Sequence, residues 1–352
     1  MKTSFKNRDM SRVICLIGII LLIAVGYFGY TKYSAPPVQM VEATDMRGMK
    51  VSVPAKINSV VTLNETADQI VYAVNKDLLK GCQPNFINKV GILPEDEQAR
   101  LKNLPAINPH YKPMSTEAIV SIHPDVIVDL LKDPNLDTRT TELNAPVYAI
   151  SKDTINEIAD GFEYVGNITG NAERGKTIKN FINDEMSAIK AKTDTIANKK
   201  KVFMANGKGL ATPGPKTIME DALEKAGAET YWSHHELGSE NPTSEGIQIP
   251  IEALLDFNPD VIVCKGQADK DLIMQDERLK NISAVKDNKV YVTLSYLRLD
   301  SVHSVPGVVW LVNHIYPGLQ TDGCYNFAAK YFNLLYGTDL NAGSKILREE
   351  NK

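Results

Sequence analysis

The sequence has little of what nucleic-acid interfaces and most enzyme active sites need. It has no basic surplus, because 39 lysines and arginines face 43 aspartates and glutamates and the formal charge is −4. A nucleic-acid surface needs a basic stripe or patch, so no nucleic-acid partner is expected. There is no Gly-x-Ser-x-Gly elbow, no nucleotide-binding fingerprint and no recognisable pair of catalytic carboxylates. We therefore expect no enzyme activity, no catalytic residue and no resident cofactor.

Cysteine is also scarce and carries no motif. The four cysteines are Cys15, Cys82, Cys264 and Cys324, and no two of them form a Cys-x-x-Cys pair. This spacing argues against a zinc knuckle and against a dithiol redox site. Buried free thiols are expected, while a bridge from Cys324 to Cys82 or to Cys264 stays open, because sequence alone does not give the geometry of a disulfide.

The N-terminus carries the one long apolar run. Basic residues precede an uncharged stretch from Val13 to about Tyr30, which predicts a cytoplasmic basic tail over 1–12 and export of the rest. The run is just long enough to span a bilayer, and no small-x-small cleavage site is well placed after it. We predict a membrane anchor or signal segment over 13–30, favouring an uncleaved anchor, and a proline-containing linker over 31–40.

An internal repeat is the most informative pattern in the exported part. Residues 114–128 and 249–263 align without gaps at an offset of 135, and both end in Pro-Asp-Val-Ile-Val. Each copy predicts a short helix that stops at proline and a wholly apolar strand. A strand that is apolar on both faces is typical of a parallel sheet covered by helices. Two copies predict two lobes of related α/β architecture.

Further strands and one long helical segment complete the organisation. Strands are predicted over 59–63, 146–150, 201–205 and 289–294, with a C-terminal helix over 324–336. Apolar residues recur at helical spacing from Thr154 to about Lys192, with a possible break near Gly170. We predict an N-terminal lobe over 41–153, a linking helix over 154–195 and a C-terminal lobe over 196–352.

Together these pieces resemble the substrate-binding proteins of iron-siderophore, haem and cobalamin ABC importers. The resemblance covers nearly all of residues 41–336. It departs from the family in lacking a lipid-attachment cysteine after the apolar run and in having Ala-Ile-Asn-Pro at 106–109, where many members have Val-Gly. The matching pieces are the strand and helix Val60–Ala73, both repeat copies, the middle helix, Thr212-Pro213-Gly214 with Ala226-Gly227, and Pro306–Leu311 running to Tyr316-Pro317.

The resemblance implies a fold and a task. The fold is class III periplasmic-binding-protein-like, with two α/β lobes that each hold a mainly parallel sheet and are joined by one long helix. The task is to capture a metal chelate between the lobes, outside the cytoplasm, and to deliver it to an ABC permease and its ATPase. Two alternatives stay open: the same fold binding a molybdate-like oxyanion or small metal complex, and a membrane-anchored enzyme or adhesion module.

Loops that follow strands are the expected ligand site, because ligands of open α/β sheets bind beyond the carboxyl ends of the strands. Arg298 offers a planar donor fork for carboxylate, catecholate or hydroxamate oxygens, and Tyr296 an aromatic wall. The adjacent His234 and His235 are read as a solvated loop, since neighbouring side chains of an extended segment point opposite ways. No metal ligand is predicted. The candidate ligand-binding residues are Asn64, Glu65, Lys132, Asn206, Lys208, Lys265, Tyr296, Arg298 and His303.

Permease docking is a further implication of the resemblance. Members of the family present an acidic residue from each lobe to arginines of the transporter. The matching regions here give Glu95 and Glu97 in the first lobe and Glu220 in the second.

Overall fold

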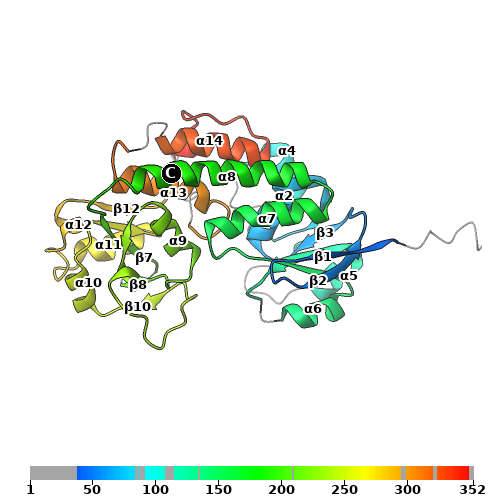
Figure 1. Ribbon diagram of the computed structural model, residues 1–352, viewed down its shortest axis with the longest axis horizontal. Coiled ribbons are helices and arrows are strands. Elements are labelled where there is room, and N and C mark those ends of the chain that lie inside the picture. The colour runs from blue at the N-terminus through cyan, green and yellow to red at the C-terminus, as the bar shows by residue number, and fades with distance from the viewer. Residues whose placement is uncertain are drawn as a thin grey trace, which may run out of the picture. The chain divides into compact units, whose positions relative to one another are not determined.

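Two α/β lobes lie at the two ends of helix α8 (Ala172–Thr193), which runs along one side of both (Figure 1). Residues Val41–Lys352 form one compact unit in the computed structural model. Among the helices described, none is long and apolar enough to cross a membrane, and the predicted anchor segment 13–30 lies outside the described residues. The structure describes residues 38–83, 86, 92–107, 115–133, 135–207, 210–294, 299–319 and 323–348.

The first lobe is a four-stranded parallel sheet in the order β4-β3-β5-β6. Every residue of β3, β5 and β6 is buried, including the polar Thr62 and Asp129, as expected for strands covered on both faces. A separate two-stranded sheet, β1-β2, precedes it. The elements are β1 (Met40–Thr44), β2 (Lys50–Pro54), β3 (Val60–Thr62), α2 (Glu65–Asn75), η1 (Lys76–Leu78), β4 (Leu79–Gly81), α4 (Glu95–Lys102), α5 (Thr116–Ile122), β5 (Val126–Leu130), α6 (Leu136–Leu143) and β6 (Val147–Ile150).

The second lobe repeats this plan with a parallel sheet in the order β12-β11-β7-β9. A short antiparallel pair, β8 and β10, lies beside it. The elements are β7 (Lys201–Ala205), β8 (Ala211–Thr212), α9 (Ile218–Lys225), β9 (Glu229–Thr230), η2 (Tyr231–Ser233), β10 (Ile247–Gln248), α10 (Ile251–Phe257), β11 (Val261–Cys264), α11 (Gln267–Gln275), α12 (Ser283–Lys286) and β12 (Val290–Val292).

The two copies of the sequence repeat fold alike. Helices α5 and α10 both end at a left-handed residue, His123 with φ 50° and Asn258 with φ 45°. The repeated aspartate then accepts hydrogen bonds from backbone N–H groups at the start of the neighbouring strand. Asp125 accepts from Ser59 at 3.0 Å, and Asp260 accepts from Lys201 at 3.0 Å. The repeat is therefore structural, since each aspartate sets the register between two strands.

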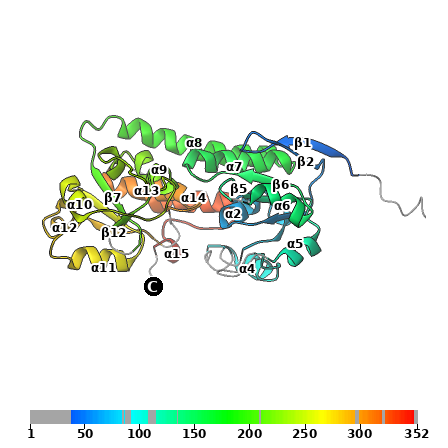
Figure 2. The same cartoon turned by 90° about the horizontal axis from the view of Figure 1, so that it is seen from below.

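The predicted linking helix is two helices in the structure. Helix α7 (Ile155–Ile168) ends at the predicted break, where Gly170 adopts φ 72°, and α8 runs back beside it (Figure 1, Figure 2). A Cβ at Gly175 of α8 would collide with the backbone carbonyl of Phe162 in α7, so glycine permits the close crossing. Of these two helices, α8 runs on to the second lobe, and it is about 33 Å long at 1.5 Å per residue.

Two C-terminal helices join the lobes from the same side as α8. Helix α13 packs against α9 of the second lobe and α14 packs against α2 of the first, and one apolar core runs through both. Cys82, Cys264 and Cys324 are buried free thiols, so the bridges left open by the sequence do not form among them. The elements are α13 (Ser304–Ile315), α14 (Gly323–Tyr336) and α15 (Lys345–Arg348).

Candidate functional site

A polar cavity of about 140 Å³ lies between the lobes, at the carboxyl ends of first-lobe strands. Its first-lobe wall comes from the loop after β3, from Gln83, which lies two residues after β4, and from the loop after β6. Its second-lobe wall comes from the segment before β10 and from the segment that leads into α13. The lining residues are Asn64, Glu65, Thr66, Gln83, Lys152, Glu245, Asp300 and Ser301.

The start of α2 positions the first of these side chains. The Asn64 amide oxygen accepts a hydrogen bond from the Thr66 backbone N–H at 2.8 Å, which is the N-cap of α2. Glu65 and Thr66 form the first turn of this helix. Because the cap uses the Asn64 oxygen, the NH₂ group of the same side chain remains for a ligand.

Hydrogen bonds to Asp68 and Leu63 hold Gln83 in place. Its backbone N–H donates to the Asp68 carboxyl at 3.1 Å, and its side-chain amide donates to the Leu63 carbonyl oxygen. Asp68 is fully buried, and burial raises its pKa well above the usual range, although hydrogen bonds from Thr62 and Gln83 oppose the rise. The wall of the cavity at Gln83 therefore rests on a preformed hydrogen-bond network.

In the second lobe, two predicted residues meet at Glu245, a residue that the sequence did not single out. The Asn206 amide donates to the Glu245 backbone carbonyl, and the Lys265 ammonium lies 3.8 Å from the Glu245 carboxylate. The Glu245 side chain is 58% exposed, so it lies at the rim. Asn64 and Glu65 from one lobe and the contacts of Asn206 and Lys265 from the other thus converge on one cleft.

The segment that crosses from β6 to α7 is tied to the second lobe at both of its ends. The Lys152 ammonium donates to the Asp300 backbone carbonyl at 2.9 Å, on the cleft side. Three residues later, the Ile155 backbone N–H donates to the Asp221 carboxylate at 2.7 Å. Burial raises the pKa of Asp221. These two hydrogen bonds hold α9 and the segment before α13 to the crossing segment.

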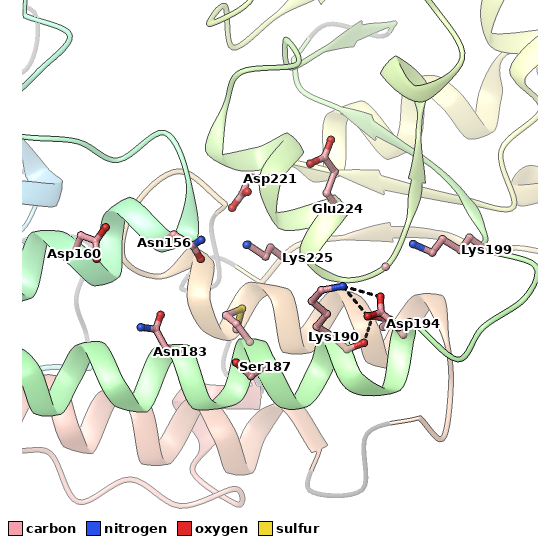
Figure 3. Close-up of a pocket in the computed structure, with 13 residues that line it drawn as sticks. Asn156, Asp160, Asn183, Ser187, Lys190, Asp194, Lys199, Asp221, Glu224 and Lys225 are labelled. Atoms are coloured by element: carbon pink, nitrogen blue, oxygen red, sulfur yellow. Dashed lines mark hydrogen bonds and ion pairs between the residues drawn. The ribbon is translucent and has the colours of Figure 1, made fainter.

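A larger cavity, of about 640 Å³, lies on the linker side, between α7, α8 and α9 (Figure 3). Helix surfaces line it rather than the loops that follow strands, and it contains an ion pair of Lys190 with Asp194 at 2.6 Å. Ligands of α/β sheets bind beyond the carboxyl ends of strands. We therefore take the smaller cavity in the cleft as the candidate ligand site.

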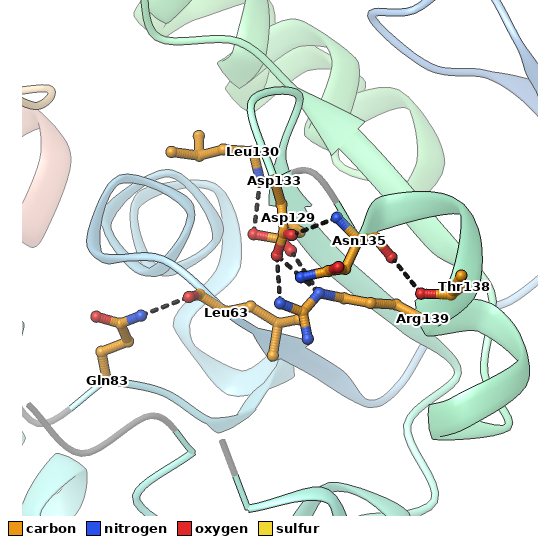
Figure 4. Close-up of polar contacts among 8 residues, drawn as sticks. All are labelled: Leu63, Gln83, Asp129, Leu130, Asp133, Asn135, Thr138 and Arg139. Carbon is orange, nitrogen blue, oxygen red and sulfur yellow. Dashed lines mark hydrogen bonds and ion pairs between the residues drawn. The ribbon is translucent and has the colours of Figure 1, made fainter. Parts of the chain in front are cut away.

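Lys132 lies outside the lining of the cleft cavity. Its ammonium pairs with the Asp153 carboxylate at 2.6 Å. Its neighbour Asp133 accepts from the Arg139 guanidinium at 2.7 Å and shares a hydrogen bond with Asp129 (Figure 4). Burial raises the pKa of Asp129 to about 7. This charged group stabilises the end of β5 and does not line the cleft cavity.

The histidines do not meet at a ligand site. His303 is buried and its ring nitrogen lies 2.8 Å from the Tyr336 hydroxyl, so it packs α13 against α14. The His234 ring contacts the Glu229 carboxylate, while the His235 ring stacks on Tyr231 at a centroid distance of 4.0 Å. Within the described ranges, no group of three or more His, Cys, Asp or Glu side chains is placed to hold a metal ion.

Two of the three docking candidates lie inside their lobes. The Glu97 carboxylate is buried and contacts Lys76 at 2.5 Å and Arg100 at 2.9 Å, while the Tyr72 hydroxyl donates to it at 3.1 Å. Glu220 is 2% exposed, and burial raises its pKa to about 7. Neither carboxylate is presented to a partner, so we withdraw both from the docking prediction. Glu95 is exposed at the start of α4.

Three predicted residues, Lys208, Tyr296 and Arg298, lie outside the described residues. Sequence reasoning missed Lys152, which lies two residues after a predicted strand. The rule that the loops after strands form the site would have found it, had it been applied to β6. Glu245 carries no comparable signal, because it follows no strand of the parallel sheets.

Comparison with known proteins identifies the family of this chain. The sequence pattern of a periplasmic binding protein family matches residues 60–297. The chain belongs to this periplasmic binding protein family. A cobalamin-binding protein of Halobacterium salinarum is 24% identical over 285 residues, which cover 76% of this chain and 73% of that protein. The molybdate-binding protein MolA of Haemophilus influenzae is 24% identical over 308 residues, covering 78% and 84%.

The fold of this family is also found in solved structures. An ABC transporter solute binding protein from Sulfurospirillum deleyianum superposes with a TM-score of 0.74 at 17% identity, covering 88% of this chain and 98% of that one. As a periplasmic binding protein, this chain is the solute-binding component of an ABC importer and works outside the cytoplasm. The family and its relatives are solute-binding proteins rather than enzymes.

Proposed function

We propose that this periplasmic binding protein captures a metal chelate of the ferric siderophore, haem or cobalamin type and delivers it to its permease. The proposal rests on one observation: loops of both lobes line one polar cavity, which lies at the carboxyl ends of parallel strands of the first lobe. A ligand held there contacts both lobes at once. It can therefore be recognised by a rigid protein and presented to a transporter that contacts both lobes.

The mixture of charges in the lining favours a chelate over a bare oxyanion. Carboxylates of Glu65, Glu245 and Asp300 share the lining with the ammonium of Lys152. A chelate displays anionic oxygens on one part of its periphery and N–H or O–H donors on another, so it can satisfy both kinds of side chain. A small oxyanion displays only acceptors, and in so small a space nearby carboxylates repel it.

A small oxyanion is the second candidate, and two observations favour it. The cavity of about 140 Å³ suits a compact solute, and its described lining contains no aromatic wall. A molybdate-binding protein is among the relatives of this chain. The first turn of α2 lies at the cavity, and helix N-termini favour anions.

A binding panel distinguishes the candidates. The full chain would be titrated, by calorimetry and by intrinsic fluorescence, with a ferric tricatecholate, a ferric trihydroxamate, haem, cyanocobalamin and molybdate. We expect saturable one-to-one binding of at least one chelate. Binding of molybdate alone would replace the main proposal with the second candidate, and binding of none of the five would remove both.

Two finer features belong to the same proposal. Residues 13–30 retain the protein in the membrane, because an uncharged run of this length can just span a bilayer. The native protein should then stay in the membrane fraction after a high-salt wash. A freely soluble mature protein that begins near Ala35 or Pro36 would show cleavage instead. Tyr296 and Arg298, which precede the lining residue Asp300, are proposed as further ligand contacts.

A further inference from the structure

Lys152 is a half-buried cation at the boundary of the two lobes. It follows β6 of the first lobe and lines the cleft cavity. Its ammonium donates to the backbone carbonyl of Asp300, a residue 148 positions away in the second lobe, at 2.9 Å. The side chain therefore joins the two lobes at the cleft cavity.

The charge of Lys152 is not neutralised by this contact. A carbonyl oxygen is a neutral acceptor, and a lysine ammonium has three N–H donors, of which this bond uses one. Two other lysines among the described residues differ: Lys132 lies 2.6 Å from the Asp153 carboxylate, and Lys265 lies 3.8 Å from the Glu245 carboxylate. Among the described residues, Lys152 forms no such ion pair.

The partly buried charge of Lys152 favours an anionic partner in the cavity. A partly desolvated ammonium is stabilised more by an anionic oxygen than by a neutral carbonyl, because opposite charges attract strongly where water is partly excluded. An anionic group in the cavity would therefore displace the Asp300 carbonyl as the partner of Lys152. A neutral group would gain little by doing so.

We propose that Lys152 is the specificity residue of the cleft: it recognises an anionic oxygen of the cargo and releases the Asp300 carbonyl in exchange. This inference rests on the proposed function and narrows it to cargo that carries a carboxylate, catecholate or oxyanion oxygen. Neutral chelates are disfavoured relative to anionic ones of similar size.

The second tie explains why this exchange leaves the lobes in place. Ile155, three residues further on, stays bonded to the Asp221 carboxylate, which lies on the linker side next to Asn156 and Lys225 (Figure 3). Loss of the Lys152 contact thus frees one end of the crossing segment only. Lys152 therefore distinguishes ligands by their charge, while the Ile155–Asp221 hydrogen bond keeps the two lobes in place.

The test compares anionic with neutral probes in three variants of the full chain. Lys152→Gln removes the charge, Lys152→Arg keeps it, and Lys280→Gln removes one exposed charge elsewhere on the second lobe, as a matched control. The anionic probes are a ferric tricatecholate, haem and molybdate, and the neutral probes are a ferric trihydroxamate and cyanocobalamin. Thermal unfolding of each variant checks that it folds.

We expect Lys152→Gln to lower the affinity for an anionic probe ten- to a hundredfold, for whichever of these probes the wild type binds. Lys152→Arg should stay within a few-fold of wild type, and the control should be unchanged. Any binding of a neutral probe should be the same in all variants. If Lys152→Gln does not fold, the salt dependence of wild-type binding is measured instead. The affinity for the anionic probe should fall as the ionic strength rises.

Three results would overturn the inference while leaving the proposed function intact. They are wild-type binding of neutral probes alone, unchanged affinity of Lys152→Gln for an anionic probe, and an equal loss for anionic and neutral probes. The last would assign Lys152 a structural role. Failure of the wild type to bind any of the five probes is a different result, since it removes the proposed function before any variant is made.

Discussion

The backbone N–H of Ile155 and the carboxylate of Asp221 lie 2.7 Å apart and join the first turn of α7 to α9 of the second lobe. An unsatisfied N–H at a helix start is normally capped by its own chain, as the Thr154 hydroxyl does here for Glu157. The Asp221 contact is therefore a cap supplied by the opposite lobe. It adds a side-chain contact between the lobes to the packing of α13 and α14.

This tie leads to the first prediction. Asp221→Ala should lower the free energy of unfolding by about 1 kcal/mol, as loss of a helix cap does, and should widen the distribution of distances between spin labels on the two lobes. Asp221→Asn keeps an acceptor and should stay close to wild type. An unchanged distance distribution in Asp221→Ala would show that α8, α13 and α14 hold the lobes without this contact.

The crossing of α7 and α8 gives the second prediction. A methyl group at Gly175 meets the backbone of Phe162 and Glu163, which cannot move aside as a side chain can. Gly175→Ala should therefore cost about 1–3 kcal/mol of stability, as overpacking of a core does, despite the better helix propensity of alanine. Gly238→Ala, where nothing lies within 4 Å, is the control. Equal stability of the two variants in urea unfolding would refute the close crossing.

The buried carboxyl of Glu220 gives a pH-dependent prediction. Burial raises its pKa from 4.5 to about 7, so the folded state holds a proton that the unfolded state releases. Its contribution to stability is therefore complete below about pH 4.5 and is lost as the pH rises through 7, of the order of 3 kcal/mol in all.

Glu220→Gln tests this directly, since it fixes the side chain in a neutral form. Urea unfolding at pH 5 should give similar stabilities for variant and wild type, and at pH 8 the variant should be the more stable. Glu277→Gln, whose side chain is 86% exposed, controls for the loss of one surface charge. A difference between variant and wild type that does not change with pH would contradict the assignment.

The exposed acids of α4 give a prediction on docking. Glu95 and Asp96 face solvent, unlike their neighbour Glu97. Reversing both to lysine should weaken association with the permease several-fold and reduce its salt dependence, because surface ion pairs act weakly one by one and mainly on encounter. Ligand affinity should not change. Uptake and permease affinity equal to wild type would exclude α4 as a docking element.

The sequence by itself determined the architecture, because that information is local and periodic. Apolar runs buried on both faces gave the parallel strands, and the repeat gave the number of lobes and their likeness. Even the break near Gly170 was visible, since glycine is the residue that adopts positive φ at a helix end. What the pattern missed was that the two halves on either side of this break pack against each other as α7 and α8.

Only the tertiary structure decided which polar residues form the site. Loop residues follow no periodic pattern from which their contacts could be predicted. Asn64 and Lys132 both follow strands, yet one lines the cavity and the other pairs with Asp153. Glu97 and Glu220 look like surface acids in sequence but are buried. Lys152 and Asp300 meet across the cleft only because α8, α13 and α14 hold the lobes together, and no spacing along the chain encodes that contact.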